Sequence, residues 1–321
     1  MTALAFALAL LAALGVFTFA ETRRIGARYP PTGMRVDAGA ATIHILETPS
    51  RGDPKGAALL IHGASGNAAD MSVALAERLS EAGFRVLSVD RPGHGWSGRA
   101  GGREGSSPVV QAEVLMRAAA VLGVPEAVVV GHSLGCITAL AMALDAPEFV
   151  RALTLIAPVS HPWPGGVAWY YGIGAHPLFG PPFGRLLTLP AGLVRMRGAV
   201  KGVFAPNPAP RNFIEATRLP LVLRPLHFRS NCEDVAYAEA AVAALSPRYA
   251  AIRAPTEIVT GDSDGVVYTH IHSIGCARDI PGARLTTLAG VGHSPHHVQP
   301  ARIVETILEA RRASEHETES A

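Results

Sequence analysis

Cysteine is scarce in this chain, with only Cys136, Cys232 and Cys276 among 321 residues. An odd number of widely spaced cysteines indicates neither a disulfide framework nor a zinc knuckle. Charge is sparse as well, because only 17% of the residues are charged and 28 basic side chains are offset by 26 acidic ones. This near balance gives no reason to expect a nucleic acid as the partner.

Charged side chains are absent from the first twenty residues. An apolar run of about 20 residues can cross a bilayer as a helix, so residues 1–22 are predicted to be a transmembrane anchor. A cleaved secretory signal peptide is the alternative, although the basic n-region is missing and residues 18–20 make a poor cleavage site. A buried core helix at the start of the fold is the third interpretation.

Three arginines, Arg23, Arg24 and Arg28, follow this apolar run. The positive-inside rule then predicts a single-pass membrane protein whose remaining chain lies in the cytoplasm. If the segment is a cleaved signal peptide instead, the mature chain is exported.

Hydrophobic residues make up 49% of the chain and fall into alternating patterns. Continuous apolar runs, typical of strands buried on both faces, alternate with segments of helical spacing. This alternation predicts an α/β fold with a mostly parallel sheet and helices on both faces. Strands are expected at 40–47, 57–63, 84–90, 126–131, 151–158, 256–265 and 283–293, and helices at 70–83, 109–123, 136–147 and 300–312.

The alternation stops at residue 161 and resumes after residue 246. The intervening segment is rich in Pro, Gly and aromatic residues and then becomes helical. We therefore expect one α/β domain formed by residues 28–160 and 247–312, with 161–246 as an insertion. The polar residues 313–321 are expected to be a disordered tail.

A serine between two glycines lies where a strand is expected to become a helix, in the segment Gly131-His132-Ser133-Leu134-Gly135. A serine hydroxyl needs a base to take its proton and donors to hold the oxyanion that it creates. A sharp strand-to-helix turn exposes the hydroxyl and leaves backbone N–H groups free at the helix start, and its crowding requires glycine on both sides. Ser133 is therefore the candidate nucleophile.

The base and the acid should follow at strand ends on the same edge of the sheet. His293 comes directly after the last expected strand, and Asp262 and Asp264 end the strand before it. The order serine, acid, histidine is the one known for this type of turn. Position alone leaves both aspartates open as the acid.

Five short segments together resemble the α/β-hydrolase superfamily over residues 28–312. They are LLIHGASG, DRPGHGWS, GHSLG, GDSDGVV and GVGH, and they occur in the family's order. The resemblance selects Asp264 as the acid beside Ser133 and His293. It implies oxyanion donors at the backbone N–H groups of Ala64 and Leu134, and it implies that residues 161–246 form a mainly helical cap.

Thirteen histidines raise the question of a metal site. The pairs His270/His272 and His296/His297 have no carboxylate or cysteine at ligand spacing, so no metal is predicted. The implied triad chemistry needs no cofactor.

The leading functional hypothesis is a serine hydrolase acting on a carboxylic ester, similar to a carboxylesterase or lipase. Its partners would be a small ester or lipid-like substrate and, through the N-terminal helix, a membrane. The same triad serves carbon–carbon bond hydrolases of ring-fission products and cofactor-free perhydrolases. A membrane-tethered binding protein that retains only the fold is the fourth hypothesis.

Overall fold

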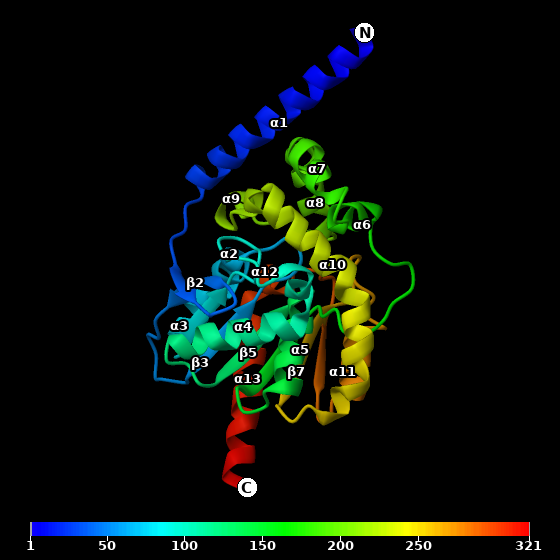
Figure 1. Cartoon of the computed structure of the whole chain (residues 1–321). Coiled ribbons are helices and arrows are strands. Elements are labelled where there is room, and N and C mark those ends of the chain that lie inside the picture. The colour runs from blue at the N-terminus through cyan, green and yellow to red at the C-terminus, as the bar shows by residue number, and fades with distance from the viewer. Residues whose placement is uncertain (1, 321) are drawn as a thin grey trace.

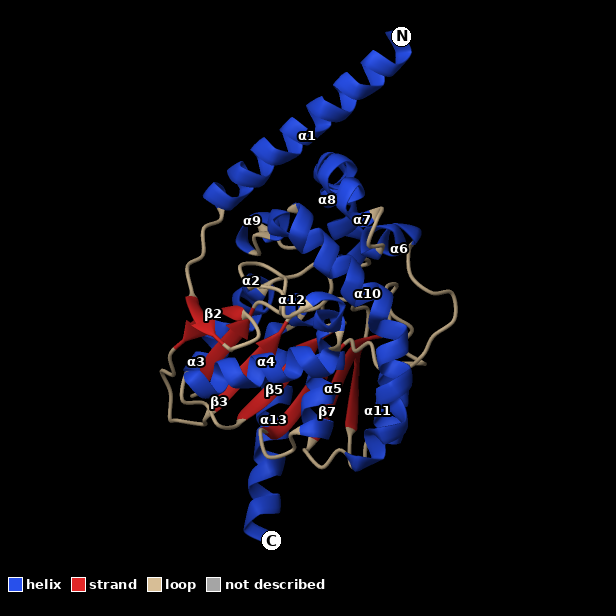
Figure 2. Ribbon diagram, viewed as in Figure 1, coloured by secondary structure: helices blue, strands red, loops and turns tan. Residues whose placement is uncertain are grey.

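A central eight-stranded sheet organises the computed structural model, which describes residues 2–320 (Figure 2). Its strand order is β1-β2-β4-β3-β5-β6-β7-β8, and from β4 to β8 all neighbours are parallel. The strands are β1 (Met34–Asp37), β2 (Thr42–Thr48), β3 (Ala57–Ile61), β4 (Arg85–Val89), β5 (Ala127–His132), β6 (Val150–Ile156), β7 (Thr256–Gly261) and β8 (Arg284–Leu288). The predicted mostly parallel α/β sheet is confirmed.

Helices cover both faces of this sheet (Figure 2). Helices α4 (Pro108–Val121) and α5 (Gly135–Asp145) pack on one face and α13 (Pro300–Ser320) packs on the other. The other long helices are α1 (Thr2–Arg28), α8 (Leu189–Phe204) and α10 (Pro225–Leu245). The shorter ones are α2 (Ala68–Met71), η1 (Ser72–Ala76), α3 (Glu77–Glu81), η2 (Gly102–Ser106), α6 (Trp169–Ala175), α7 (Gly180–Phe183), η3 (Gly184–Thr188), α9 (Phe213–Ala216), η4 (Leu219–Leu223), η5 (Ser246–Ala251), α11 (Ser273–Asp279) and α12 (Pro295–Val298).

The apolar runs of the central strands supply two cores, one on each face of the sheet. In β3, Leu59 and Ile61 belong to the core shared with α4 and α5, whereas Ala58 and Leu60 belong to the core shared with α13. Successive strand side chains point to opposite faces, so a strand buried on both faces must be apolar at every position. This is why the central strands lack the alternation of a half-exposed strand.

The segment between β6 and β7 is helical and lies above the carboxyl edge of the sheet (Figure 1). It contains α6, α7, α8 and α9 and ends in α10, which descends along the body of the molecule and packs against α5. We call residues 161–246 the helical insertion. Its position places it over the strand ends where the candidate site residues are expected.

Helix α1 projects from the body of the molecule at its amino end, and its carboxyl half contacts the insertion (Figure 1). Ile25 and Tyr29 are buried in a small apolar cluster with residues of the insertion, among them Met196 and Leu223. Over its most apolar 18-residue window, however, only 6% of the helix is buried, and its length and composition suffice to cross a membrane. The expected apolar N-terminal helix is therefore present, and it is not a core helix.

Two segments differ from the sequence-based expectation. Helix α13 continues through Ser320, whereas disorder was expected from residue 313, and residue 321 lies outside the described part. An ion pair between Arg311 and Glu315, four residues apart, supports the extra turns. The short edge strand β1 was also not expected, because its four residues carry no clear apolar pattern.

Candidate active site

Ser133 lies at the turn between β5 and α5 with a φ of 51°. Few non-glycine residues adopt this left-handed conformation, and backbone strain of this kind clusters at functional sites. The turn is held on both sides, because the Ser133 N–H donates to the Ile156 carbonyl at 2.9 Å and the Ser133 carbonyl accepts from the Cys136 N–H at 3.0 Å. The serine is thus presented at the carboxyl edge of the sheet.

The two flanking glycines are required by crowding. A Cβ added to Gly135 would lie 2.5 Å from the His62 carbonyl oxygen, and one added to Gly131 would lie 2.8 Å from the Cys136 Cα. Both contacts involve backbone atoms that cannot move aside. The pattern glycine-x-serine-x-glycine therefore has a steric cause at this turn.

His293 reaches Ser133 from the loop between β8 and α12. Its Nε2 lies 2.9 Å from the Ser133 Oγ, and its Nδ1 lies 2.8 Å from the Asp264 Oδ2. An ionised carboxylate only accepts hydrogen bonds, so Nδ1 carries the proton and Nε2 is left to accept from the serine hydroxyl. The three predicted residues are brought together with the tautomer that a base acting on Ser133 requires.

Of the two candidate acids, only Asp264 contacts the histidine. Its other oxygen, Oδ1, accepts from the Val266 and Val267 N–H groups at 2.8 and 3.1 Å, so both oxygens are held. Asp262 is exposed, and its Oδ1 accepts from the Gly290 N–H at 2.8 Å. The two carboxylates are two residues apart, yet one orients His293 and the other ties two surface loops together.

Ala64 and Leu134 line the same cavity as Ser133, with a volume of about 500 Å³. Leu134 immediately precedes α5, and the first N–H groups of a helix have no intrahelical acceptor. Ala64 follows β3 on the neighbouring loop. The placement is the one expected of oxyanion donors, and that role of Ala64 and Leu134 remains a prediction.

Asn231 of α10 supports the loop that carries Ala64, and the sequence did not reveal this contact. The Ser65 N–H donates to the Asn231 Oδ1 at 2.6 Å, and the Asn231 Nδ2 donates to the Ser65 Oγ at 3.2 Å. Ser65 itself has a φ of 58°. The insertion therefore helps to fix the conformation of this loop. In the sequence, the only indication of this contact was a polar residue, Asn231, within a segment of helical spacing.

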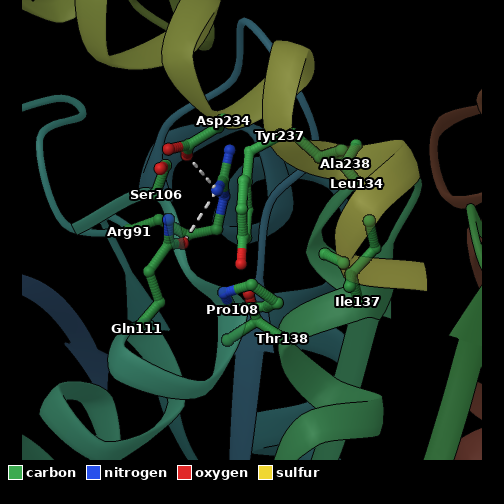
Figure 3. Close-up of a pocket in the computed structure, with 11 residues that line it drawn as sticks. Arg91, Ser106, Pro108, Gln111, Leu134, Ile137, Thr138, Asp234, Tyr237 and Ala238 are labelled. Atoms are coloured by element: carbon green, nitrogen blue, oxygen red, sulfur yellow. Dashed lines mark hydrogen bonds and ion pairs between the residues drawn. The ribbon is translucent and has the colours of Figure 1, made fainter. Parts of the chain in front are cut away.

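A buried ion pair ties α10 to the loop after β4. The Arg91 guanidinium donates to Asp234 at 2.6 Å and to Gln111 of α4 at 2.9 Å, and Figure 3 shows it between the two. The small pocket drawn there measures about 10 Å³, which is room for about one water molecule. This pocket is too small for a substrate. The Arg91–Asp234 ion pair instead connects the insertion to the core.

Several histidines near the site are buried and neutral. Burial lowers the pKa of His62 and of His227 to about 4, with Arg91 and Arg224 respectively adding to the effect. The His62 Nε2 accepts from the Arg91 N–H at 3.0 Å, a bond that protonation would abolish. His62 thus orients two loops around the site in its neutral form.

We expect these histidines to destabilise the fold in acid. The pKa of His227 is about 4 in the folded protein and about 6.5 in the unfolded chain. Between these values the unfolded chain binds a proton that the folded protein does not. The stabilisation from neutral His227 is therefore full above pH 6.5 and is lost as the pH falls toward 4. Each such group adds up to ~1.4 kcal/mol per pH unit to the slope of the unfolding free energy. Urea unfolding between pH 4 and 8 should show a shallower slope for His227→Gln than for the wild type.

The control is His270→Gln, which removes an exposed histidine and keeps His227, so this variant should retain the contribution of His227 to the slope. Equal slopes for His227→Gln and the wild type would contradict the assignment of His227 as a buried neutral group.

The sequence of this chain is similar to a known protein family and to bacterial proteins. A family model described as alpha/beta hydrolase fold matches residues 57–300. The magnesium-chelatase 30 kDa subunit of Rhodobacter capsulatus is 32% identical over 70% of this chain and 77% of its own length. An uncharacterized protein of Mycobacterium tuberculosis is 29% identical over 78% of this chain and 74% of its own length.

Solved structures share the fold at low sequence identity. The enol-lactonase of Burkholderia xenovorans is 18% identical with a TM-score of 0.69, over 85% of this chain and 97% of its own. A putative lipase of Acinetobacter baumannii is 20% identical with a TM-score of 0.68, over 94% and 97%. A bacterial membrane phospholipase A is 22% identical with a TM-score of 0.62, over 97% and 99%.

Proposed function

Since the chain belongs to the alpha/beta hydrolase fold family, we propose that it is a serine hydrolase that cleaves a carboxylic ester or a similar acyl bond. The observation that carries this proposal is the hydrogen-bonded line from Asp264 through His293 to Ser133. Its geometry is that of a nucleophile, a general base and a carboxylate that orients the base.

In the proposed mechanism, the Ser133 Oγ attacks the acyl carbonyl carbon while the His293 Nε2 takes the hydroxyl proton. Asp264 holds the imidazole in place and stabilises the imidazolium that forms. The Ala64 and Leu134 N–H groups donate to the oxyanion, and His293 then protonates the leaving alcohol. Water repeats the sequence on the acyl-enzyme and releases the acid, so the cycle needs no cofactor.

The lining of the cavities supports an apolar ester as the substrate. Within residues 2–320, neither lysine nor arginine lines the 500 Å³ cavity at Ser133. A second cavity of about 910 Å³ in the insertion shares Ala168 and Tyr171 with it and is lined mainly by aromatic and aliphatic side chains, such as Phe183 and Met196. We propose that the insertion acts as a cap that receives the acyl or alcohol part.

The same lining argues against the runner-up activity. A ring-fission product cleaved at a carbon–carbon bond carries a carboxylate, which a site normally binds with a cationic side chain. Among the described residues, none lines the cavity at Ser133, and the one arginine of the second cavity, Arg195, lies in the insertion. An ester is therefore favoured, and hydrolysis assays of both substrate types would separate the two activities. Peracid formation with hydrogen peroxide would reveal a perhydrolase.

A fluorophosphonate probe tests the proposed nucleophile directly. We expect one covalent adduct per chain, mapped to Ser133 by peptide mass spectrometry, because the probe reacts with a serine activated by a neighbouring base. Ser133→Ala should not be labelled, whereas Ser50→Ala, at the opposite edge of the sheet, should be. A wild-type protein that resists the probe and hydrolyses no ester would favour the binding-protein hypothesis.

We also propose that α1 anchors the enzyme in a membrane as a single-pass helix, with the catalytic domain on the cytoplasmic side. The helix is apolar and exposed along most of its length, and Arg23, Arg24 and Arg28 follow its apolar part. Its end is tied to the insertion, since the Arg28 guanidinium and the Tyr29 hydroxyl both donate to Glu215. A membrane ester would then lie close to the cap.

Deleting residues 2–22 should move the protein from the membrane fraction to the soluble fraction. The truncated chain keeps Ile25 and Tyr29, which pack against the insertion, so it should fold and retain hydrolysis of water-soluble esters. Carbonate extraction of cell membranes followed by immunoblotting measures the distribution. Full-length protein found in the soluble fraction, or truncated protein found in membranes, would contradict the anchor.

A further inference from the structure

A cluster of two buried histidines and one partly buried aspartate lies beside His293, the proposed base. Asp70 of α2, His132 at the end of β5 and His296 of α12 each offer one ligand atom, and these atoms all lie within 4.8 Å of one another. The sequence predicted no metal site, because the pair His296/His297 has no carboxylate at ligand spacing. The fold brings Asp70 and His132 to it from distant segments.

Three of the four histidine nitrogens in this cluster lack a hydrogen-bond partner within the described part of the chain. They are Nδ1 and Nε2 of His296, whose side chain is fully buried, and Nδ1 of His132. The Nε2 of His132 is engaged with the His293 carbonyl at 3.0 Å, so its unpaired Nδ1 carries the lone pair. Buried polar atoms without a partner are unfavourable and require an explanation.

His297 completes the arrangement by orienting the carboxylate. Its Nε2 lies 2.9 Å from the Asp70 Oδ1, while the Asp70 Oδ2 lies 3.7 Å from the His296 Nε2. The second distance is too long for a hydrogen bond and close to the ~3.4 Å that separates two ligands of a tetrahedral zinc ion. Carboxylates that ligate a metal are themselves hydrogen-bonded by an outer-shell group, and His297 would fill that role for Asp70.

We propose that Asp70, His132 and His296 form a binding site for one divalent ion of the zinc type. Two imidazoles and one carboxylate are a ligand set that zinc accepts, with a fourth position left for water. The ion would join the segment before η1, the strand end that precedes Ser133 and the helix that follows His293. It lies outside the proposed acyl-transfer chemistry and would act by holding these segments together.

The test uses full-length protein without a histidine tag, in detergent and stripped with a chelator. Titration calorimetry with Zn²⁺ should show one ion per chain, and the melting temperature should rise with Zn²⁺ concentration. X-ray absorption at the zinc edge should show scattering from two imidazoles. A wild-type protein that binds no ion, or a bound ion with fewer than two imidazoles, would overturn the proposal without recourse to variants.

Variants then assign the ligands. His296→Gln and Asp70→Asn should each weaken Zn²⁺ binding by at least ~10-fold, since even outer-shell changes cost 10–100-fold. The exposed His176 is the matched control, and His176→Gln should bind as the wild type does. Unchanged affinity in both His296→Gln and Asp70→Asn, or an equal loss in His176→Gln, would show surface binding and refute the site. None of these readouts depends on esterase activity.

Discussion

Ser133→Ala should lower the rate of hydrolysis of short p-nitrophenyl esters by roughly 10⁴–10⁶-fold, because the variant retains the cavity and loses the attacking oxygen. The measurement is kcat/KM on the chain that begins at Arg23, with substrates of increasing acyl length. The wild-type preference for acyl length then reports on the apolar cavities of the insertion. Alanine fits the turn in volume, although the positive φ at this position costs it some stability.

Ser50→Ala is the matched control. Ser50 follows the end of β2, which pairs with the start of β4. Since β4 is parallel to β3 and β5, its start lies at the amino edge of the sheet, whereas Ser133 lies at the carboxyl edge. Its removal should leave the rate unchanged. If Ser133→Ala, with a melting curve that shows a folded protein, hydrolysed esters as fast as the wild type, the proposed acyl-enzyme mechanism would be refuted.

Asp264→Asn should lower kcat by roughly 10⁴-fold while the protein stays folded. The carboxylate accepts from the His293 Nδ1 at 2.8 Å, and an amide in its place favours the wrong imidazole tautomer and no longer stabilises the imidazolium. The backbone bonds from Val266 and Val267 can persist to the amide oxygen, so the loop should keep its shape. Steady-state kinetics at several pH values measures the effect.

Asp262→Asn separates the catalytic acid from its neighbour. The amide oxygen can still accept from the Gly290 N–H, and Asp262 does not touch His293, so the rate should remain close to that of the wild type. The opposite ranking, with Asp262→Asn inactive and Asp264→Asn active, would reverse the assignment of the acid. The two variants have the same chemistry two residues apart, which removes most general effects of charge loss.

Some of this molecule could be read from local sequence because local forces determine it. The central strands are apolar at every position since they are buried on both faces, and β3 and β5 lie where their apolar runs predicted them. The glycines around Ser133 are dictated by backbone atoms in contact range. The order of serine, aspartate and histidine along the chain, together with the strand ends that carry them, then indicated a triad.

Other features depend on where distant segments meet. The sequence could not pair Arg91 with Asp234, or Asn231 with Ser65, because these contacts cross from the core to the insertion. The edge strand β1 is defined by its pairing with β2 and not by its own residues.

Sequence by itself thus determined the mostly parallel α/β sheet, the apolar N-terminal helix and the candidate nucleophile, because period, length and steric crowding act within a few residues. Tertiary structure decided which aspartate reaches His293 and which histidines gather around Asp70. These choices are made by distances between side chains that are 29 to more than 200 positions apart, as for Asp264 with His293 and Asp70 with His297. No local pattern encodes such distances, because they result from the packing of the whole chain.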